Sequence, residues 1–179
     1  MGEGKRTPNN SWGLTLLVDS REKTPFDLVD GSKIIASERI KLDTGDYAIK
    51  DIDEKWLCIE RKSGISELYA CLTSQRKRFE KEIERMREFH HKFIVIEADA
   101  EDVNNLEEYF WIKSSDNRKQ WAIRQTASKI IRSSLINWSI LDNIHFLFIG
   151  KNRTLSKHWM YSIIDRAYID WQRTQDLGR

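Results

Sequence analysis

Two short stretches of the chain decide its fold and its chemistry: GDYAI at residues 45–49 and LCIERK at residues 57–62. Each holds a short apolar run typical of a buried strand, and the polar segment between them has the length of a hairpin connection. If the loop is centred on Asp53, Asp46 lies directly opposite Glu60. The hairpin therefore predicts two neighbouring carboxylates, because opposed Cβ atoms are about 4.5–5.5 Å apart.

Lys62 extends this pair, since side chains two residues apart project from the same face of a strand. The prediction depends on the register, because a slip of one residue turns one strand's side chains to the other face. Two carboxylates suit Mg²⁺, which proteins hold with one or two carboxylates and substrate phosphate. A nearby lysine can orient a metal-activated water or offset negative charge in the transition state.

A plainer interpretation of the same residues is a surface ion pair, worth about 0–1 kcal/mol. Against it stands the apolar run Leu57-Cys58-Ile59 beside Glu60, because buried charges are costly unless they are paired or bound to metal. Spacing alone leaves both interpretations open.

Around the hairpin, the hydrophobic pattern alternates between strands and helices. We expect strands at 14–18, 33–42, 47–49, 56–59, 93–96 and 145–149. We expect one helix of more than twenty residues from Ser66, a second at 121–138 with Trp121 and Trp138 in the core, and a third at about 155–171. This order predicts an α/β fold with a central mixed sheet.

Composition fits one globular domain. The 179 residues are 40% hydrophobic and include seven Trp, which supports a sizeable core and excludes disordered and collagen-like chains. We expect residues 1–12 to be a flexible N-terminal tail and 13–179 to form a single domain. The formal net charge of +2 does not by itself indicate a nucleic-acid partner.

The two cysteines, Cys58 and Cys71, form neither a disulfide framework nor a metal-ligand set, so we expect buried thiols in a reducing compartment. No apolar run reaches the roughly 18 residues that span a bilayer, and residues 1–12 lack the apolar stretch of a secretory signal. The expectation is a chain without membrane association. Its location would be cytoplasmic and nucleoid-associated in a prokaryote or virus, and nuclear in a eukaryote.

A basic stretch lies at 113–132, with six bases against one acid between Lys113 and Ser133. It is either a solvated helix face or a surface that follows a phosphate backbone, with Lys119 and Arg124 as contacts. His90 and His91 end the first predicted helix. We interpret them as a cap or a solvated pair, because no Cys or acid stands at ligand spacing in the sequence.

Three ordered motifs resemble the XPF-type structure-specific DNA endonucleases, of the PD-(D/E)XK restriction-endonuclease-like fold. Residues 18–22 read VDSRE and match the family's Val-Asp-x-Arg-Glu. Gly45-Asp46, thirteen further residues and Glu60-Arg61-Lys62 match its Gly-Asp and Glu-Arg-Lys. Residues 75–82 resemble the family's helix with Arg-x-Arg-Phe.

The resemblance implies a three-layer fold, with the mixed sheet flanked by long helices, and a metal-dependent nuclease site. Asp46 and Glu60 would bind Mg²⁺ or Mn²⁺, and Lys62 would position or activate the attacking water. The remaining implied site residues are Asp19 and Glu22, lining the same site, and Arg21, Arg76 and Arg78, contacting DNA phosphates. Arg61 points to the opposite face by strand alternation, so we expect it to pack or pair structurally.

Two departures from the family pattern matter. The family's Asp after Glu-Arg-Lys-x-x-x is Ser66 here, and Glu67, one place later, is the candidate replacement. Many family members also append tandem helix-hairpin-helix domains, whose hairpins need Gly. After Gly64 only Gly150 and Gly178 remain, so no such module is expected here.

The leading hypothesis is an endonuclease that cuts DNA at branches, flaps or single-strand/double-strand junctions, in repair or recombination. The alternatives are a catalytically inactive DNA-binding scaffold of the same fold and a restriction-like enzyme that cuts duplex DNA. The last predicted helix carries two apolar rows, so we expect either a homodimer through this helix, as in the family, or burial of both rows within one chain.

Overall fold

The computed structural model describes residues 13–104, 106 and 117–177. The tail at 1–12 and the basic residue Lys113 lie outside this part. The strands are β1 (Leu14–Asp19), β2 (Ile34–Ile40), β3 (Tyr47–Ile49), β4 (Leu57–Lys62), β5 (His91–Ile96) and β6 (His145–Phe148). The helices are α1 (Ile65–Leu72), α2 (Arg76–Met86), the short 3₁₀ helix η1 (Ala100–Val103), α3 (Asn117–Asp142) and α4 (Arg153–Leu177).

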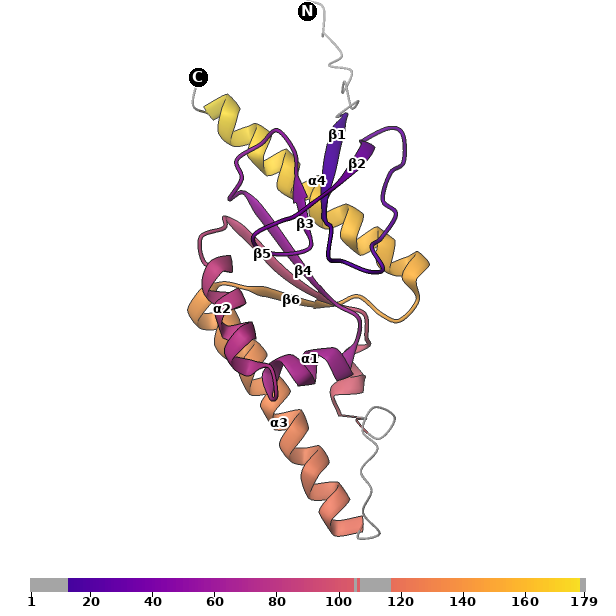
Figure 1. Ribbon diagram of the computed structural model, residues 1–179, viewed down its shortest axis with the longest axis vertical. Coiled ribbons are helices and arrows are strands. Elements are labelled where there is room, and N and C mark those ends of the chain that lie inside the picture. The colour runs from indigo at the N-terminus through magenta and orange to yellow at the C-terminus, as the bar shows by residue number, and fades with distance from the viewer. Residues whose placement is uncertain (1–12, 105, 107–116, 178–179) are drawn as a thin grey trace, which may run out of the picture.

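The strands form one sheet in the order β2-β1-β3-β4-β5-β6 (Figure 1). β3 runs antiparallel to both of its neighbours, β1 and β4, whereas the pairs β1–β2, β4–β5 and β5–β6 are parallel. The predicted mixed sheet is therefore confirmed. β4 and β5 are buried along most of their length, because helices cover both faces of the sheet there.

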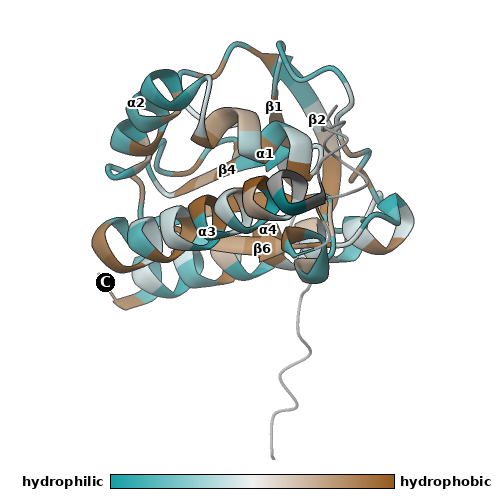
Figure 2. Cartoon of the chain, turned by 90° about the horizontal axis from the view of Figure 1, so that it is seen from below, coloured by the Kyte–Doolittle hydropathy of each residue, from teal (hydrophilic) through white to brown (hydrophobic). Residues whose placement is uncertain are grey.

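Two hydrophobic cores lie on opposite faces of the sheet. One contains residues of α1, α2 and α3, and the other contains residues of β1, β3 and α4. The outer side of α2 is mostly hydrophilic (Figure 2), as expected for a helix that buries one stripe. The result is the predicted arrangement of three layers, with helices on both faces of the sheet.

The hairpin has the register that the sequence predicted. Tyr47 pairs with Ile59, as a loop centred on Asp53 requires. Asp46 lies one residue before β3, and its backbone N–H donates to the Ile59 carbonyl at 2.7 Å, which holds Asp46 beside β4. Gly45 makes the tight entry to β3 possible. It has φ of +77°, and a Cβ there would lie 2.6 Å from Cys58 Sγ and 3.1 Å from the Ile59 carbonyl oxygen.

We expect Gly45→Ala to destabilise the protein by about 2–4 kcal/mol, since the left-handed backbone and the clash add. Gly31→Ala is the matched control, because Gly31 has φ of +71° but no atom within 4 Å of a Cβ. It should show only the backbone part of the cost, about 1–2 kcal/mol. Urea unfolding measures both; equal losses would show that the contact with Cys58 is harmless.

The single long helix predicted from Ser66 is wrong, because the chain breaks between α1 and α2. Thr73 Oγ1 donates to the Tyr69 carbonyl at 2.7 Å, and Ser74 Oγ donates to the Ala70 carbonyl at 3.4 Å. Such side-chain bonds to the preceding turn compete with the backbone ladder of a helix. The break lets α1 and α2 each direct an apolar face toward the same core.

α3 and α4 are longer than predicted. α3 buries Trp138 as expected, but Trp121 is 63% exposed, which corrects the prediction that it lies in the core. The amino-terminal part of α3 extends beyond the sheet (Figure 1), and within the described residues Trp121 and Ile123 are exposed there. No helix within the described ranges is long and apolar enough to cross a membrane.

Candidate active site

A cleft of about 700 Å³ opens where β3 and β4 meet the segment 21–24 and helices α1 and α2. Its lining is rich in charge. The ionisable residues along it are Arg21, Glu22, Lys23, Asp46, Glu60, Arg61, Lys62, Glu67, Cys71, Arg78 and Glu82.

Asp46, Glu60 and Lys62 come together in this cleft. Lys62 Nζ lies 2.5 Å from Glu60 Oε1, and the ammonium also lies 4.9 Å from the centre of the Phe79 ring. Asp46 Oδ2 accepts a hydrogen bond of 2.7 Å from the Arg61 backbone N–H. Strand pairing thus positions one carboxylate, and strand alternation brings the ammonium to the other.

The pKa values of the three groups reflect a buried, strongly coupled site. Burial, followed by repulsion from Glu60, raises the pKa of Asp46 to about 8. Burial also raises the pKa of Glu60, although attraction to Lys62 opposes the rise. For Lys62, burial lowers the pKa, but the charge of Glu60 outweighs it and the net pKa is raised. Lys62 is therefore a cation at neutral pH and not a base.

This donor set fits a hard divalent cation. Two buried carboxylates with raised pKa values repel each other when both are ionised, and a bound cation would compensate both charges. Carboxylate oxygens are the protein ligands that Mg²⁺ and Mn²⁺ prefer. Asp46 and Glu60 are the residues that would hold it.

Glu22 lines the cleft but is held by a buried network. Arg61 Nη1 lies 3.1 Å from Glu22 Oε1, and Arg61 Nε forms a second ion pair with Glu97, which follows β5. The Thr24 backbone N–H donates to Glu22 Oε1 at 2.7 Å. Arg61 therefore forms structural ion pairs, as its position on β4 predicts, and it fixes the orientation of Glu22.

Asp19 is placed differently from the other predicted acids. Its carboxylate is 1% exposed and does not line the cleft. It accepts hydrogen bonds from the backbone N–H groups of Arg21 and Leu42 and from the Arg21 guanidinium at 2.5 Å. Burial raises its pKa, but the bonds from Arg21 prevail and lower it. The geometry suits Asp19 to holding Arg21 at the mouth of the cleft.

Glu67 also reaches the cleft. Its Oε2 accepts hydrogen bonds from the Ser63 backbone N–H at 2.8 Å and hydroxyl at 2.7 Å, and its Oε1 lies 4.0 Å from Lys62 Nζ. The structure thus places an acid near Lys62 although the family's Asp is Ser66 here.

The predicted DNA-binding residues fall into two groups. Arg21 and Arg78 line the cleft. Arg76 pairs with Glu80 at 2.8 Å and does not line it, and Arg124 lies on α3 away from it. Lys119 lies in α3, and its side chain is outside the described part of the structure.

The sequence interpretation gave no site role to several cleft residues, among them Glu82, Cys71 and Gln75. Glu82 Oε1 accepts a hydrogen bond of 3.3 Å from the Gly45 backbone N–H, which ties α2 to the start of β3. A signal was available, because Gln75, Arg78 and Glu82 follow helical spacing and form one polar stripe beside the apolar face of α2.

Comparison with known proteins gives a family and a fold. The sequence profile of the ERCC4 domain matches residues 18–163. The solved structures of XPF from Aeropyrum pernix, and of that protein in complex with DNA, both superpose with a TM-score of 0.57 at 14% identity. They cover 86% and 88% of this chain, which spans 61% and 66% of theirs. No similar sequence was found among curated proteins.

Proposed function

The chain belongs to the ERCC4 domain family, and on this premise we propose that it is a metal-dependent endonuclease that hydrolyses DNA phosphodiester bonds. The observation that carries the proposal is the meeting of Asp46, Glu60 and Lys62 in one charged cleft. An inactive scaffold would have no use for two costly carboxylates beside a buried ammonium.

Each cleft residue has a role in this proposal. Asp46 and Glu60 would hold Mg²⁺ or Mn²⁺, and the ion would supply charge stabilisation at the phosphoryl oxygens and lower the pKa of bound water. Lys62, fixed by Glu60, orients the attacking water and offsets the negative charge that develops on the phosphate. Glu22, held by Arg61, adds a third carboxylate to the cleft beside Asp46 and Glu60.

The proposed substrate is DNA at branches, flaps or single-strand/double-strand junctions. The solved complex of XPF from Aeropyrum pernix contains DNA, and the present chain has the same fold. Arg21 and Arg78 line the cleft, and in this proposal they hold DNA phosphates near the scissile bond. Lys119 and Arg124 on α3 would extend this contact along the backbone.

We also propose a homodimer that uses α4. Of its two apolar rows, Met160 and Ile164 are fully buried within the chain, whereas Leu155 and Trp159 are 60% and 53% exposed. The start of the helix therefore offers exposed apolar side chains to a partner. Sedimentation should show a dimer at micromolar concentration, and Trp159→Ser should weaken it; a monomer at that concentration would argue against the dimer.

Incubation with labelled flap, fork and linear duplex DNA in Mg²⁺ or Mn²⁺ tests the activity. We expect incision near the junctions, none in EDTA, and none with Glu60→Gln. The matched control is Glu80→Gln, because Glu80 is an exposed carboxylate paired with Arg76. Cuts at fixed sequences in linear duplex would indicate a restriction-like enzyme, and binding of branched DNA without turnover would indicate a scaffold.

A further inference from the structure

A second group of ligand-type side chains lies at the opposite end of the sheet from the cleft. It consists of His90, His91 and Asp170. His91 begins β5, whereas Lys62 of the cleft pairs with Ile96, five residues further along β5. At the rise of a strand this separates the two sites by about 16 Å. The group is therefore independent of the proposed catalytic residues.

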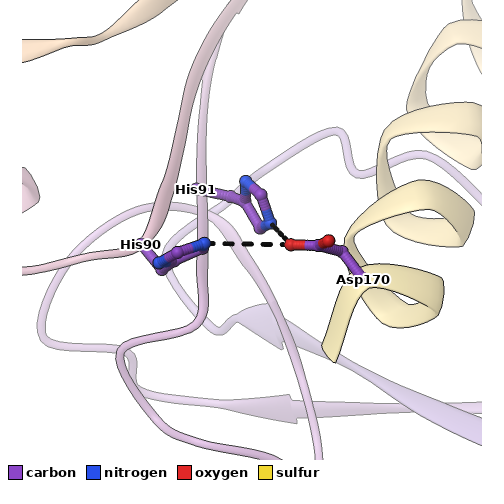
Figure 3. Close-up of side chains that lie close together, drawn as sticks. All are labelled: His90, His91 and Asp170. Atoms are coloured by element: carbon purple, nitrogen blue, oxygen red, sulfur yellow. Dashed lines mark hydrogen bonds and ion pairs between the residues drawn. The ribbon is translucent and has the colours of Figure 1, made fainter. Parts of the chain in front are cut away.

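The three side chains converge on one point (Figure 3). His91 Nε2 lies 3.0 Å from Asp170 Oδ2, and His90 Nε2 lies 3.8 Å from the same oxygen. All three ligand atoms lie within 4.8 Å of one another. Tetrahedral Zn²⁺, with bonds of about 2.0–2.1 Å, separates neighbouring ligand atoms by about 3.3 Å. Ligand atoms that lie within 4.8 Å of one another would have to approach by at most about 1.5 Å to reach that geometry.

Adjacent residues of a regular strand point to opposite faces, so this convergence needs a cause. The backbone N–H groups of His90 and His91 donate to the carbonyls of Lys55 and Trp56, at 2.7 and 2.8 Å. His90 lies just before β5, so the alternation of side chains along the strand does not apply to it. The rings of His90 and His91 can therefore meet edge to face, with centroids 4.5 Å apart.

The Trp56 indole holds this arrangement in place. It stacks on His90 with centroids 4.3 Å apart and meets His91 edge-on at 5.4 Å. Its N–H donates at 2.8 Å to the carbonyl of Ala167, three residues before Asp170 on α4. The same buried side chain thus orients both imidazoles and fixes the helix that carries the carboxylate. Such preorganisation lowers the entropic cost of binding.

We propose that His90, His91 and Asp170 bind Zn²⁺ and so attach α4 to the start of β5. Two imidazoles and one carboxylate form the donor set of a three-ligand zinc site with a fourth position for water. Nitrogen donors favour Zn²⁺ over Mg²⁺, which distinguishes this site from the all-oxygen pair in the cleft. His90 is 56% exposed and His91 25%, so the ion can enter from solvent.

Zinc binding to the metal-free full chain is measured by competition with a chromophoric chelator, in a Glu60→Gln background that weakens binding in the cleft. We expect one Zn²⁺ per chain with micromolar affinity, a rise in the melting temperature, and a tetrahedral visible spectrum when Co²⁺ replaces zinc. His90→Ala and Asp170→Asn should each weaken binding at least about tenfold. His158→Ala, an exposed histidine on α4, should change nothing.

The His90 variant separates this proposal from a simple ion pair. His91 already bonds Asp170 without any metal, and that contact does not need His90. If His90→Ala binds zinc as tightly as the parent, or if the parent binds none at micromolar concentration, the site does not exist. No step of this test uses DNA, so it is unaffected by the outcome of the cleavage assay.

Discussion

Replacing Asp46 with Asn should abolish DNA cleavage while making the protein more stable. The amide has the shape of the carboxylate, and its oxygen can still accept the hydrogen bond of the Arg61 backbone N–H. What is lost is a negative charge that the proposed metal site needs. Metal ions supply several kcal/mol of charge stabilisation, so we expect cleavage to fall at least about 1,000-fold.

The gain in stability follows from the raised pKa of Asp46. An unfolded Asp has a pKa near 3.8, whereas burial and Glu60 raise the folded value to about 8. Between these values the folded state binds more protons than the unfolded state, so stability falls as the pH rises. That loss is complete above pH 8 and absent below pH 4. The amide of Asp46→Asn does not titrate, so the variant does not undergo this loss of stability.

One pKa unit corresponds to about 1.4 kcal/mol of folding free energy. Because Asp46 and Glu60 titrate together, only part of the whole shift belongs to Asp46. We therefore expect Asp46→Asn to raise the free energy of unfolding by about 2–4 kcal/mol at pH 8.5. Below pH 4 the variant and the parent should be equally stable. Mg²⁺ should stabilise the parent at pH 8.5 and leave the variant unchanged.

Urea unfolding at both pH values, with EDTA and with Mg²⁺, measures these effects. Glu80→Gln is the control for removal of an exposed carboxylate. A variant whose stability declines with pH in parallel with the parent would show that Asp46 titrates normally and is not part of a strained metal site.

The sequence was most informative where local rules decide the structure. Strand alternation and hairpin length were enough to predict the pairing of Tyr47 with Ile59, the closeness of Asp46 to Glu60 and the position of Lys62. Most of the strands were found for a similar reason, because buried strands are short apolar runs bounded by turn residues; β2 is the exception, since most of it is exposed. Family motifs then indicated the chemistry of the cleft.

Prediction failed where the outcome depends on distant parts of the chain. Asp170 lies 79 positions after His91, so no ligand spacing in the sequence could reveal their contact. Trp121 has the spacing of the buried residues of α3, but it lies on a part of the helix that projects beyond the core, so it is exposed. At the break between α1 and α2, two hydroxyls donate to backbone carbonyls of the preceding turn. The spacing of apolar residues carries no information about such hydrogen bonds.

Lys62→Met should reduce cleavage about 100- to 1,000-fold and should also change its dependence on pH. Methionine keeps the apolar stem against Phe79 but removes the ammonium that bonds Glu60 at 2.5 Å. Because Lys62 opposes the rise in the pKa of Glu60, its removal should raise that pKa further. A metal ion bound at Glu60 would then have to displace a proton that is held more tightly.

Two readouts follow for this variant. Cleavage should increase with pH over a range that lies above the parent's, and the Mg²⁺ concentration for half-maximal activity at pH 7 should rise. Lys92→Met is the matched control, since Lys92 is equally buried on β5 but bonds the Phe89 carbonyl and lies outside the cleft. If Lys62→Met lost activity with no change in pH profile or metal requirement, the ammonium would act on the substrate and not through the pKa of Glu60. If it kept full activity, Lys62 would have no part in catalysis.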